Sequence, residues 1–170
     1  AEKVWVLPDV PVGGDAAAAP AEDLRGHVGD GGAIALYVGN LETYQGIDLL
    51  LHGLARVPAS APLKTVIIGG SAAHIAHYRQ LAEQLGIGAR TWFLGPRPVA
   101  QLPAYLEQAD ILLSPRTLGQ NTPMKVYSYM AAGKAIVATG IRSHLQVLDD
   151  ATAAIVTLEP ASMAAALERL

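Results

Sequence analysis

The chain has 170 residues, of which 51% are hydrophobic and 16% are charged. These proportions suit one globular domain with a sizeable core and exclude a chain that is disordered throughout. The net charge of −3, from 12 Lys and Arg against 15 Asp and Glu, argues against general nucleic-acid binding. Cysteine is absent, which excludes disulfides, thiolate metal sites and thiol catalysis.

The first 32 residues differ in character from the rest. Residues 3–8 have the pattern of a short strand. Residues 13–32 are rich in Gly, Ala, Pro and Asp, which indicates a mobile linker with at most a short helix around residues 20–25. We therefore divide the chain into an N-terminal strand with a flexible linker (1–32) and a domain (33–170). Because it begins with Ala1 rather than Met, we expect a piece of a longer protein.

From residue 33 onward, strand patterns alternate with helical patterns. Strands are expected at 33–38, 63–70, 90–95, 110–115, 134–140 and 153–158. Helices are expected at 46–57, 71–87, from 102 onward, 122–133, 143–150 and 160–170. This alternation predicts a doubly wound, mostly parallel Rossmann-like α/β sheet, and strands that are apolar throughout fit a sheet covered on both faces.

The segment that follows the fourth strand, PRTLGQNTPMK (115–125), is the most informative stretch of the chain. Ligands of open α/β sheets bind where the strand order reverses, which for the order 3-2-1-4-5-6 lies between the first and fourth strands. Gly119 allows a close turn, and Asn121 or Thr122 is expected to cap the following helix, with Pro123 at its first position. The N–H groups of that first turn favour an anion.

Two cations flank this segment. Arg116 offers a planar fork of donors suited to phosphate oxygens. Lys125 lies in the first helical turn, where a cation opposes the helix dipole by ~0.3–1 kcal/mol, which suggests an anionic partner. The first strand is followed by GNLETYQG rather than GxGxxG, and no GxxxxGK[ST] occurs, so neither the dinucleotide fingerprint nor a P-loop is present.

Residues 33–170 resemble the C-terminal half of family 4 (group 1) glycosyltransferases, which are retaining enzymes of the GT-B fold. The resemblance is carried by YVGNLETYQGIDLLLHGLARV, by VIIGGS and above all by the strand-to-helix stretch 110–140. It implies a Rossmann-like domain that binds a nucleoside-diphosphate sugar, while a separate N-terminal domain binds most of the acceptor. It also implies transfer with retention and no requirement for a metal or another cofactor.

The resemblance assigns roles residue by residue. Gln120 and Ser128 stand where the family usually has two Glu, the second of which grips the ribose, and Asn40 and Gln45 stand where many members have an Arg and a Lys on the phosphates. Arg116 and Lys125 are expected to take over that cationic work. The donor-binding residues implied are Gly39, Asn40, Gly69, Gly70, Ser71, Pro96, Arg97, Val99, Gly119, Gln120, Asn121, Thr122 and Ser128. For Arg97 a surface role stays open beside the binding role.

The remaining polar residues are weighed against simpler explanations. His74 and His77 are better explained by a solvated helix face than by a metal site, and the pair 149–150 by a turn or cap. His144 follows the fifth strand at the same sheet edge, so both a cleft role and a structural role stay open. Tyr127 and Tyr129 are expected to pack their helix.

Three hypotheses of function follow. The first is the donor-binding domain of a glycosyltransferase whose acceptor would be a glycan or a lipid-linked sugar. The full-length protein is then expected in the cytoplasm, with a location at the inner face of the membrane as the alternative. The second is a non-catalytic nucleotide-sugar-binding or scaffold module of the same fold. The third, a nicotinamide-dependent oxidoreductase or an epimerase, is disfavoured by the missing glycine fingerprint.

Overall fold

A computed structural model describes residues 20–170, so the strand expected at residues 3–8 lies outside the described residues. Six parallel strands form one sheet in the order β3-β2-β1-β4-β5-β6, as the expected doubly wound topology requires. The strands are β1 (Ala33–Val38), β2 (Leu63–Ile68), β3 (Thr91–Gly95), β4 (Ile111–Ser114), β5 (Ala135–Thr139) and β6 (Ala154–Val156). All six lie where the apolar runs predicted them.

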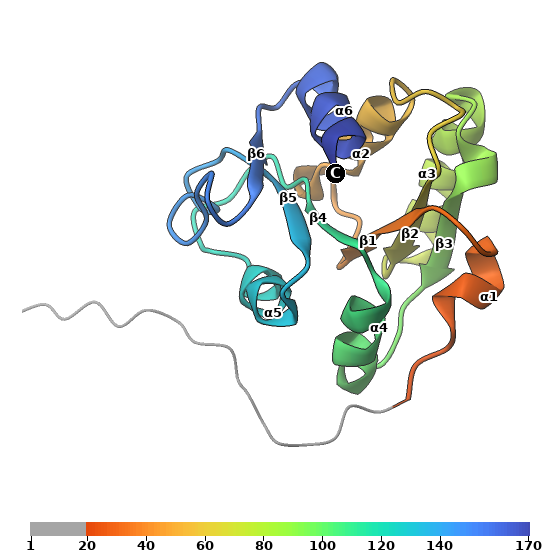
Figure 1. The fold of residues 1–170 in the computed structure, drawn as a ribbon, viewed down its shortest axis with the longest axis horizontal. Helices are drawn as coiled ribbons and strands as arrows, with labels where there is room; N and C mark the ends of the chain where they lie inside the picture. The colour runs from red at the N-terminus through yellow and green to blue at the C-terminus, as the bar shows by residue number, and fades with distance from the viewer. Residues whose placement is uncertain (1–19) are drawn as a thin grey trace, which may run out of the picture.

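Helices cover both faces of the sheet (Figure 1). The α-helices are α1 (Leu24–Val28), α2 (Ile47–Leu54), α3 (Ala72–Gln84), α4 (Leu102–Gln108), α5 (Met124–Ala132) and α6 (Pro160–Arg169). Short 3-10 turns are η1 (Thr43–Gln45), η2 (Gly88–Arg90) and η3 (Val99–Gln101). Because helices cover both faces of the sheet, strand residues can be apolar on both faces.

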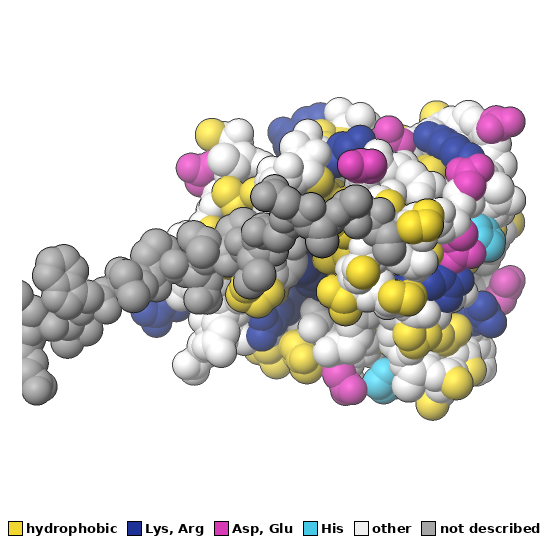
Figure 2. Space-filling model, turned by 90° about the horizontal axis from the view of Figure 1, so that it is seen from below, with side chains coloured by type: hydrophobic (Ala, Val, Ile, Leu, Met, Phe, Trp, Pro, Cys, Tyr) yellow, Lys and Arg dark blue, Asp and Glu magenta, His cyan; other side chains and the backbone are white. Residues whose placement is uncertain are grey.

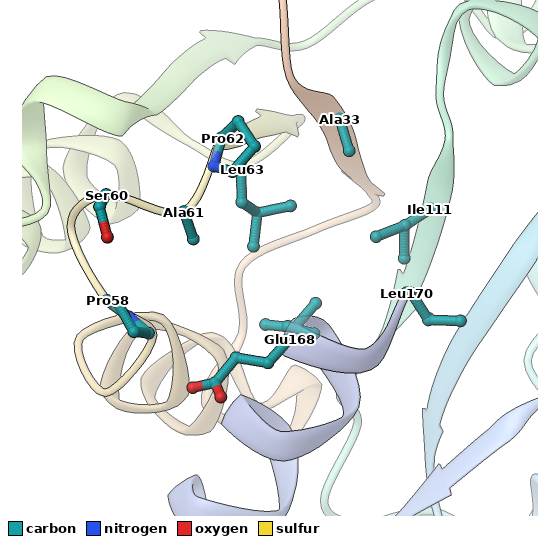
Figure 3. A pocket seen from close by; sticks show the side chains of 10 residues that line it. Ala33, Pro58, Ser60, Ala61, Pro62, Leu63, Ile111, Glu168 and Leu170 are labelled. Carbon is teal, nitrogen blue, oxygen red and sulfur yellow. The ribbon is translucent and has the colours of Figure 1, made fainter.

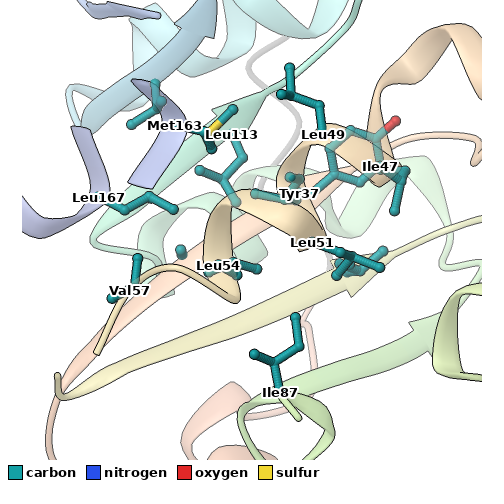
Figure 4. Close-up of a cluster of buried hydrophobic side chains, with 14 of the residues drawn as sticks. Tyr37, Ile47, Leu49, Leu51, Leu54, Val57, Ile87, Leu113, Met163 and Leu167 are labelled. Carbon is teal, nitrogen blue, oxygen red and sulfur yellow. The ribbon is translucent and has the colours of Figure 1, made fainter. Parts of the chain in front are cut away.

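The core is divided by the sheet into two clusters. One cluster packs α2, α3 and α6 against strand residues such as Tyr37, Ile67 and Leu113, and Figure 4 shows α2 side chains between Tyr37, Leu113 and the α6 residues Met163 and Leu167. The other packs α1, α4 and α5 against the opposite face. Side chains of each strand point alternately into these two buried layers, which fix the strands. The loops at the strand ends therefore start from fixed positions.

The segment expected to be a mobile linker contributes to the core. Its helix lies at Leu24–Val28 rather than around residues 20–25, and the side chains of Leu24 and Val28 are buried. Gln108 Oε1 in α4 accepts from the Leu24 amide at 2.7 Å. From residue 24 onward this segment therefore packs on the domain.

One expected helix is not formed. Residues 143–150 make a series of turns, in which isolated bonds such as those from the amides of Leu145 to Ile141 O (3.1 Å) and Leu148 to His144 O (2.9 Å) replace a continuous helix. The buried side chain of His144 is bonded to the end of β5, and this tertiary contact outweighs the weak local helical pattern. The Asp149 side chain accepts from the amides of Ala151 and Thr152, so the expectation of a turn at 149–150 is confirmed.

Candidate functional site

A cleft of about 370 Å³ lies beyond the carboxyl ends of β1, β2 and β3. Its lining includes eight of the residues that the sequence analysis placed at the donor, namely Gly39, Asn40, Gly69, Gly70, Ser71, Pro96, Arg97 and Val99. Glu42 and His74 also line it. Parallel strands bring these residues together because their carboxyl ends share one sheet edge.

The floor of this cleft is bare backbone. Gly69 has φ 115°, and a Cβ on it would lie only 2.0 Å from the carbonyl oxygen of Gly39. Gly70 has φ 82°, and its Cβ would overlap the side chain of Leu41. Because only glycine fits these positions, a ligand can approach the main chain closely here.

Lys125, in α5, brings an amine to the main chain at the end of β1, although its own side chain does not line the cleft. Its Nζ donates to Val38 O and to Gln45 Oε1, each at 3.3 Å, and lies 4.0 Å from the centre of the Tyr37 ring. A Cβ on Gly39 would lie only 3.2 Å from this Nζ. The amine therefore lies directly against the main chain that lines the cleft.

The Lys125 amine has no counter-charge within the described residues. None of the ion pairs within residues 20–170 involves it. Burial, reinforced by the nearby positive charge of Arg116, lowers the pKa of Lys125 to about 7. An anion in the cleft would supply the missing charge and favour the protonated amine.

The Arg116 guanidinium folds over its own loop and over an aromatic ring. Its Nε donates to Leu118 O at 2.6 Å and its Nη1 to Asn121 O at 3.1 Å, while its Cζ lies 5.4 Å from the centre of the Tyr44 ring. Gly119, at φ 140°, has no room for a Cβ beside this guanidinium. The loop thus holds the cation in one position next to Lys125.

Arg97 is held by a residue of the N-terminal segment. Its Nε donates to Glu22 Oε1 at 2.5 Å, and its Nη1 donates to Leu94 O at 2.5 Å. Hydrogen bonds from Arg97, His27 and Tyr105 hold the pKa of the Glu22 carboxyl down to about 2. Arg97 lines the cleft, yet its guanidinium is used in this network.

The start of α5 differs from the expectation. The helix begins at Met124, Pro123 is its N-cap residue, and no side chain caps it, so the assignments of Asn121 or Thr122 as the cap and of Pro123 as the first helical residue are wrong. Thr122 Oγ1 instead donates to Gln146 Oε1 at 2.6 Å. The rigid proline ring and this contact to the turn after β5 set the loop geometry without a cap.

Two of the predicted residues of the β4–α5 loop line a different hollow, whereas Gly119 and Thr122 line neither that hollow nor the cleft. Gln120 and Asn121 face a space of about 470 Å³ that is shared with Arg142 and Gln146, which follow β5. Ser128, in α5, is half-buried and lines neither this hollow nor the cleft. The structure therefore separates Gln120 and Asn121 from the residues at the ends of β1, β2 and β3.

His144 does not face the cleft. Its side chain is completely buried, with Nδ1 2.8 Å from Thr139 O and Nε2 2.9 Å from Ser114 Oγ. A carbonyl oxygen only accepts, so Nδ1 carries the hydrogen and Nε2 accepts from the serine hydroxyl. Burial lowers the pKa of His144, and the neutral ring ties the end of β4 to the end of β5. Thr139 Oγ1 in turn donates to the carbonyl of Arg116.

At the opposite edge of the sheet the cations are used by the fold: Lys64 Nζ donates to the carbonyls of Gly29 and Asp30, and the Arg90 guanidinium donates to main-chain carbonyls after α2. A hollow of about 450 Å³ there is lined mainly by apolar side chains such as Pro58, Pro62, Ile111 and Leu170, with Glu168 at its side (Figure 3). Among residues 20–170, no group of three His, Asp or Glu is placed to hold a metal ion. No helix in the same part of the chain is long and apolar enough to cross a bilayer.

Sequence reasoning missed several residues of the site. Tyr44 was not singled out, although it lies two residues before the glycine that opens α2. Arg142 and Gln146 were also missed, and the one signal for them was the adjacency of the fourth and fifth strands in the expected sheet order. Glu22 lies 75 residues from its partner Arg97, so no local pattern could indicate that pair.

Comparison with known proteins decides the family. The family described as "Glycosyl transferases group 1" matches residues 32–170. The chain belongs to this family. That membership argues against the oxidoreductase and epimerase hypothesis and agrees with the six-stranded parallel sheet.

Curated relatives within the group 1 family match only over part of their length. A D-inositol 3-phosphate glycosyltransferase from Corynebacterium diphtheriae is 29% identical over 145 residues, which cover 81% of this chain and 34% of the relative. The protein of the same name from Corynebacterium jeikeium is 32% identical over 110 residues, covering 61% of this chain and 26% of the relative. The chain thus spans about a third or less of these relatives.

Solved structures with the same fold include longer chains and a separate domain. HepE of Anabaena, in complex with UDP and glucose, has a TM-score of 0.75 at 20% identity, covering 86% of this chain and 40% of that one. The C-terminal domain of a group 1 glycosyltransferase, LpcC of Francisella tularensis, has a TM-score of 0.70 at 17% identity, covering 90% and 84%. The fold is therefore that of one domain of GT-B glycosyltransferases.

Proposed function

We propose that this chain is the donor-binding domain of a retaining, family 4 glycosyltransferase that moves a sugar from a nucleoside diphosphate to an acceptor hydroxyl. The observation that carries the proposal is the Lys125 amine, which has no counter-charge within residues 20–170 and lies against the glycine main chain beside the cleft. Such an arrangement is costly in an empty site and favourable when a phosphate is bound.

The geometry suggests a place for each part of the donor. The nucleoside would lie in the cleft over β1, β2 and β3, with its diphosphate against Lys125 and Arg116. Negative charge grows on the diphosphate as the glycosidic bond breaks, so fixed cations and N–H groups lower the barrier. The proposal needs no metal and no other cofactor.

The relatives supply the first substrates to try. Several structural neighbours are complexes with UDP or UDP-glucose, so a uridine diphosphate is the first candidate donor. The curated relatives are named for D-inositol 3-phosphate, which makes a phosphorylated polyol an acceptor to test beside glycans and lipid-linked sugars. We expect most acceptor contacts, and any membrane contact, to come from a second domain.

Binding to the 170-residue chain tests the proposal. We would measure UDP, GDP, ADP, dTDP and NAD by thermal shift and titration calorimetry, and expect one diphosphate to bind and NAD not to bind. A ligand present at 100 times its Kd stabilises the folded state by about 2.7 kcal/mol, which a thermal shift detects. Lys125→Met should weaken that diphosphate by about tenfold or more, because a charge-assisted bond is lost. Replacing both Arg116 and Lys125 with Ala should abolish the binding.

Lys134→Met is the matched control. Lys134 Nζ donates to Glu107 O in α4, at the far edge of the sheet, so the same change of charge there should leave the Kd unaltered. Equal affinity of the wild type and the Lys125 variant would contradict the phosphate assignment.

A non-catalytic binding module stays as the second candidate. It is favoured by Gln120 and Ser128, which stand where the family's two Glu are expected, and by the position of Ser128 outside both hollows. Turnover of a donor by the full-length protein would decide for the enzyme, and binding without turnover would decide for the module.

A further inference from the structure

The loop that follows β3 forms one wall of the cleft, since Pro96, Arg97 and Val99 all line it. β3 ends at Gly95, whose φ of 76° turns the chain out of the strand. Residues 96–98 carry a single N–H group, that of Arg97, because the other two residues are prolines. Main-chain hydrogen bonds can therefore do little to fix this wall, and its shape depends on side chains.

The Arg97 guanidinium is the side chain around which this loop folds. Its Nη1 donates to Leu94 O at 2.5 Å and to Pro96 O at 3.1 Å, so carbonyls on both sides of the turn at Gly95 point at one group. A Cβ on Gly95 would lie 4.0 Å from the same Nη1. The place of the guanidinium therefore sets where Pro96 and Val99 can meet a ligand.

Glu22, from the segment before α1, holds this guanidinium in turn. Its Oε1 accepts from Arg97 Nε at 2.5 Å and from the Tyr105 hydroxyl at 3.1 Å, and its Oε2 lies 2.8 Å from His27 Nε2. Gln108 Nε2 donates to the Glu22 carbonyl oxygen at 3.1 Å, so the main chain of Glu22 is held as well. The carboxylate is thus fixed at several points, and it fixes the direction of the guanidinium.

We propose that Glu22 is a positioning residue for the donor site, which acts through the Arg97 guanidinium on the loop that forms the wall of the cleft. The inference rests on the proposed donor function. Glu22 itself is not among the residues that line the cleft, so its effect has to pass through Arg97. A wall that is already ordered spares the nucleotide the cost of ordering it on binding. The segment before α1 then serves donor binding as well as the core.

The test is a double-mutant cycle on nucleotide affinity. UDP, and then GDP, ADP and dTDP, are titrated into the 170-residue chain by calorimetry, and the diphosphate that binds the wild type is used for the variants. Glu22→Gln and Arg97→Gln should each weaken it by about three- to tenfold, because the loop then has to be ordered on binding. The double variant should lose no more than either single one, since the two residues act as a unit.

Arg25→Gln is the matched control. Arg25 Nη2 lies 3.4 Å from Asp110 Oδ2, so this pair also ties the N-terminal segment to the domain through a partly exposed contact. Neither residue lines the cleft. The control should lower stability as the loss of a surface ion pair does, and should leave the Kd of the diphosphate unaltered.

The mobility of the loop gives a readout that needs no ligand. In Glu22→Gln the amide order parameters of Arg97 and Val99, measured by NMR relaxation, should fall, and in Arg25→Gln they should stay as in the wild type. A contact that only stabilises the fold would change neither of these signals selectively.

The outcomes separate this inference from the proposed function. If none of the four diphosphates binds the wild type, the donor function fails and the positioning role fails with it. If the wild type binds one of them and Glu22→Gln binds it equally well, the inference alone is overturned. Additive losses in the double variant, or a loop that stays rigid in Glu22→Gln, would overturn it in the same way.

Discussion

Lys125 is the residue at which sequence and structure agree most directly. Its place in the first turn of a helix was unfavourable on electrostatic grounds, and the structure adds burial, an aromatic ring and the charge of Arg116. These contacts do not neutralise the amine. The residue is therefore a source of instability in the free protein that a bound anion would relieve.

The pH dependence of stability follows from the same residue. The native pKa of about 7 lies below the ordinary value of 10.5, so the unfolded state binds more protons between these values and stability should rise with pH across that window. Below about pH 7 both states hold the proton and the contribution is constant. Urea unfolding of the wild type and Lys125→Met at pH 7, 8 and 9 measures the difference. Parallel curves for the two proteins would show that the amine titrates normally.

The roles of Arg97 and His144 could not be decided from the sequence. Arg97 was expected at the donor, and it does line the cleft, yet its guanidinium is bonded to Glu22. His144 was open to a cleft role or a structural role, and its burial decides for the structural one. In both cases the deciding partner is distant in sequence or lies on a neighbouring strand.

At the scale of elements, strands were predictable and the loops between them were less so. Apolar runs identified all six strands, because a sheet buried on both faces needs them. The start of α5 and the segment 143–150 were predicted incorrectly, because side-chain contacts between loops overrode local signals. These loops carry much of the candidate site.

The contact between the ends of β1 and β2 is the element-level feature most open to test. Gly69→Ala places a Cβ 2.0 Å from Gly39 O at φ 115°, and should cost ~4 kcal/mol or more because backbone has to move. Gly86→Ala is the control, since it has φ 70° with nothing within 4 Å and should cost only the left-handed strain of about 1–2 kcal/mol. Equal losses in urea unfolding would argue that the two strand ends separate easily.

At the scale of the whole molecule, the N-terminal segment and the domain form one packed unit from residue 24 onward. Leu24 and Val28 belong to the core cluster of α4 and α5. On the face seen in Figure 2, Lys and Arg side chains are interspersed with acidic and neutral ones wherever the described residues are visible. That face therefore carries no continuous basic surface over its visible described part.

Glu22 should make the stability of the folded state depend on pH in the acid range. Its native pKa of about 2 lies below the ordinary 4.5, so its contribution is present above pH 4.5 and is lost as the pH falls from 4.5 to 2. Glu22→Gln should lower stability by about 1 kcal/mol at pH 7, since the pair with Arg97 is partly exposed. Unfolding at pH 7 and pH 3 measures the difference, with Glu107→Gln, an exposed carboxylate on α4, as the control. A loss as large at pH 3 as at pH 7 would count against the ion pair.

Sequence periodicity was sufficient for the α/β class, because strands and helices bury their apolar faces through local patterns that any parallel sheet repeats. The strand order was expected from the common order of doubly wound sheets and is confirmed. The resemblance in residues 110–140 was sufficient for the family. Tertiary structure alone decided which polar groups meet. It placed Lys125 against Gly39, bonded Arg97 to Glu22, and divided the expected residues between a cleft and a hollow. These contacts join segments far apart in the chain, and their geometry depends on how two layers of helices pack on one sheet.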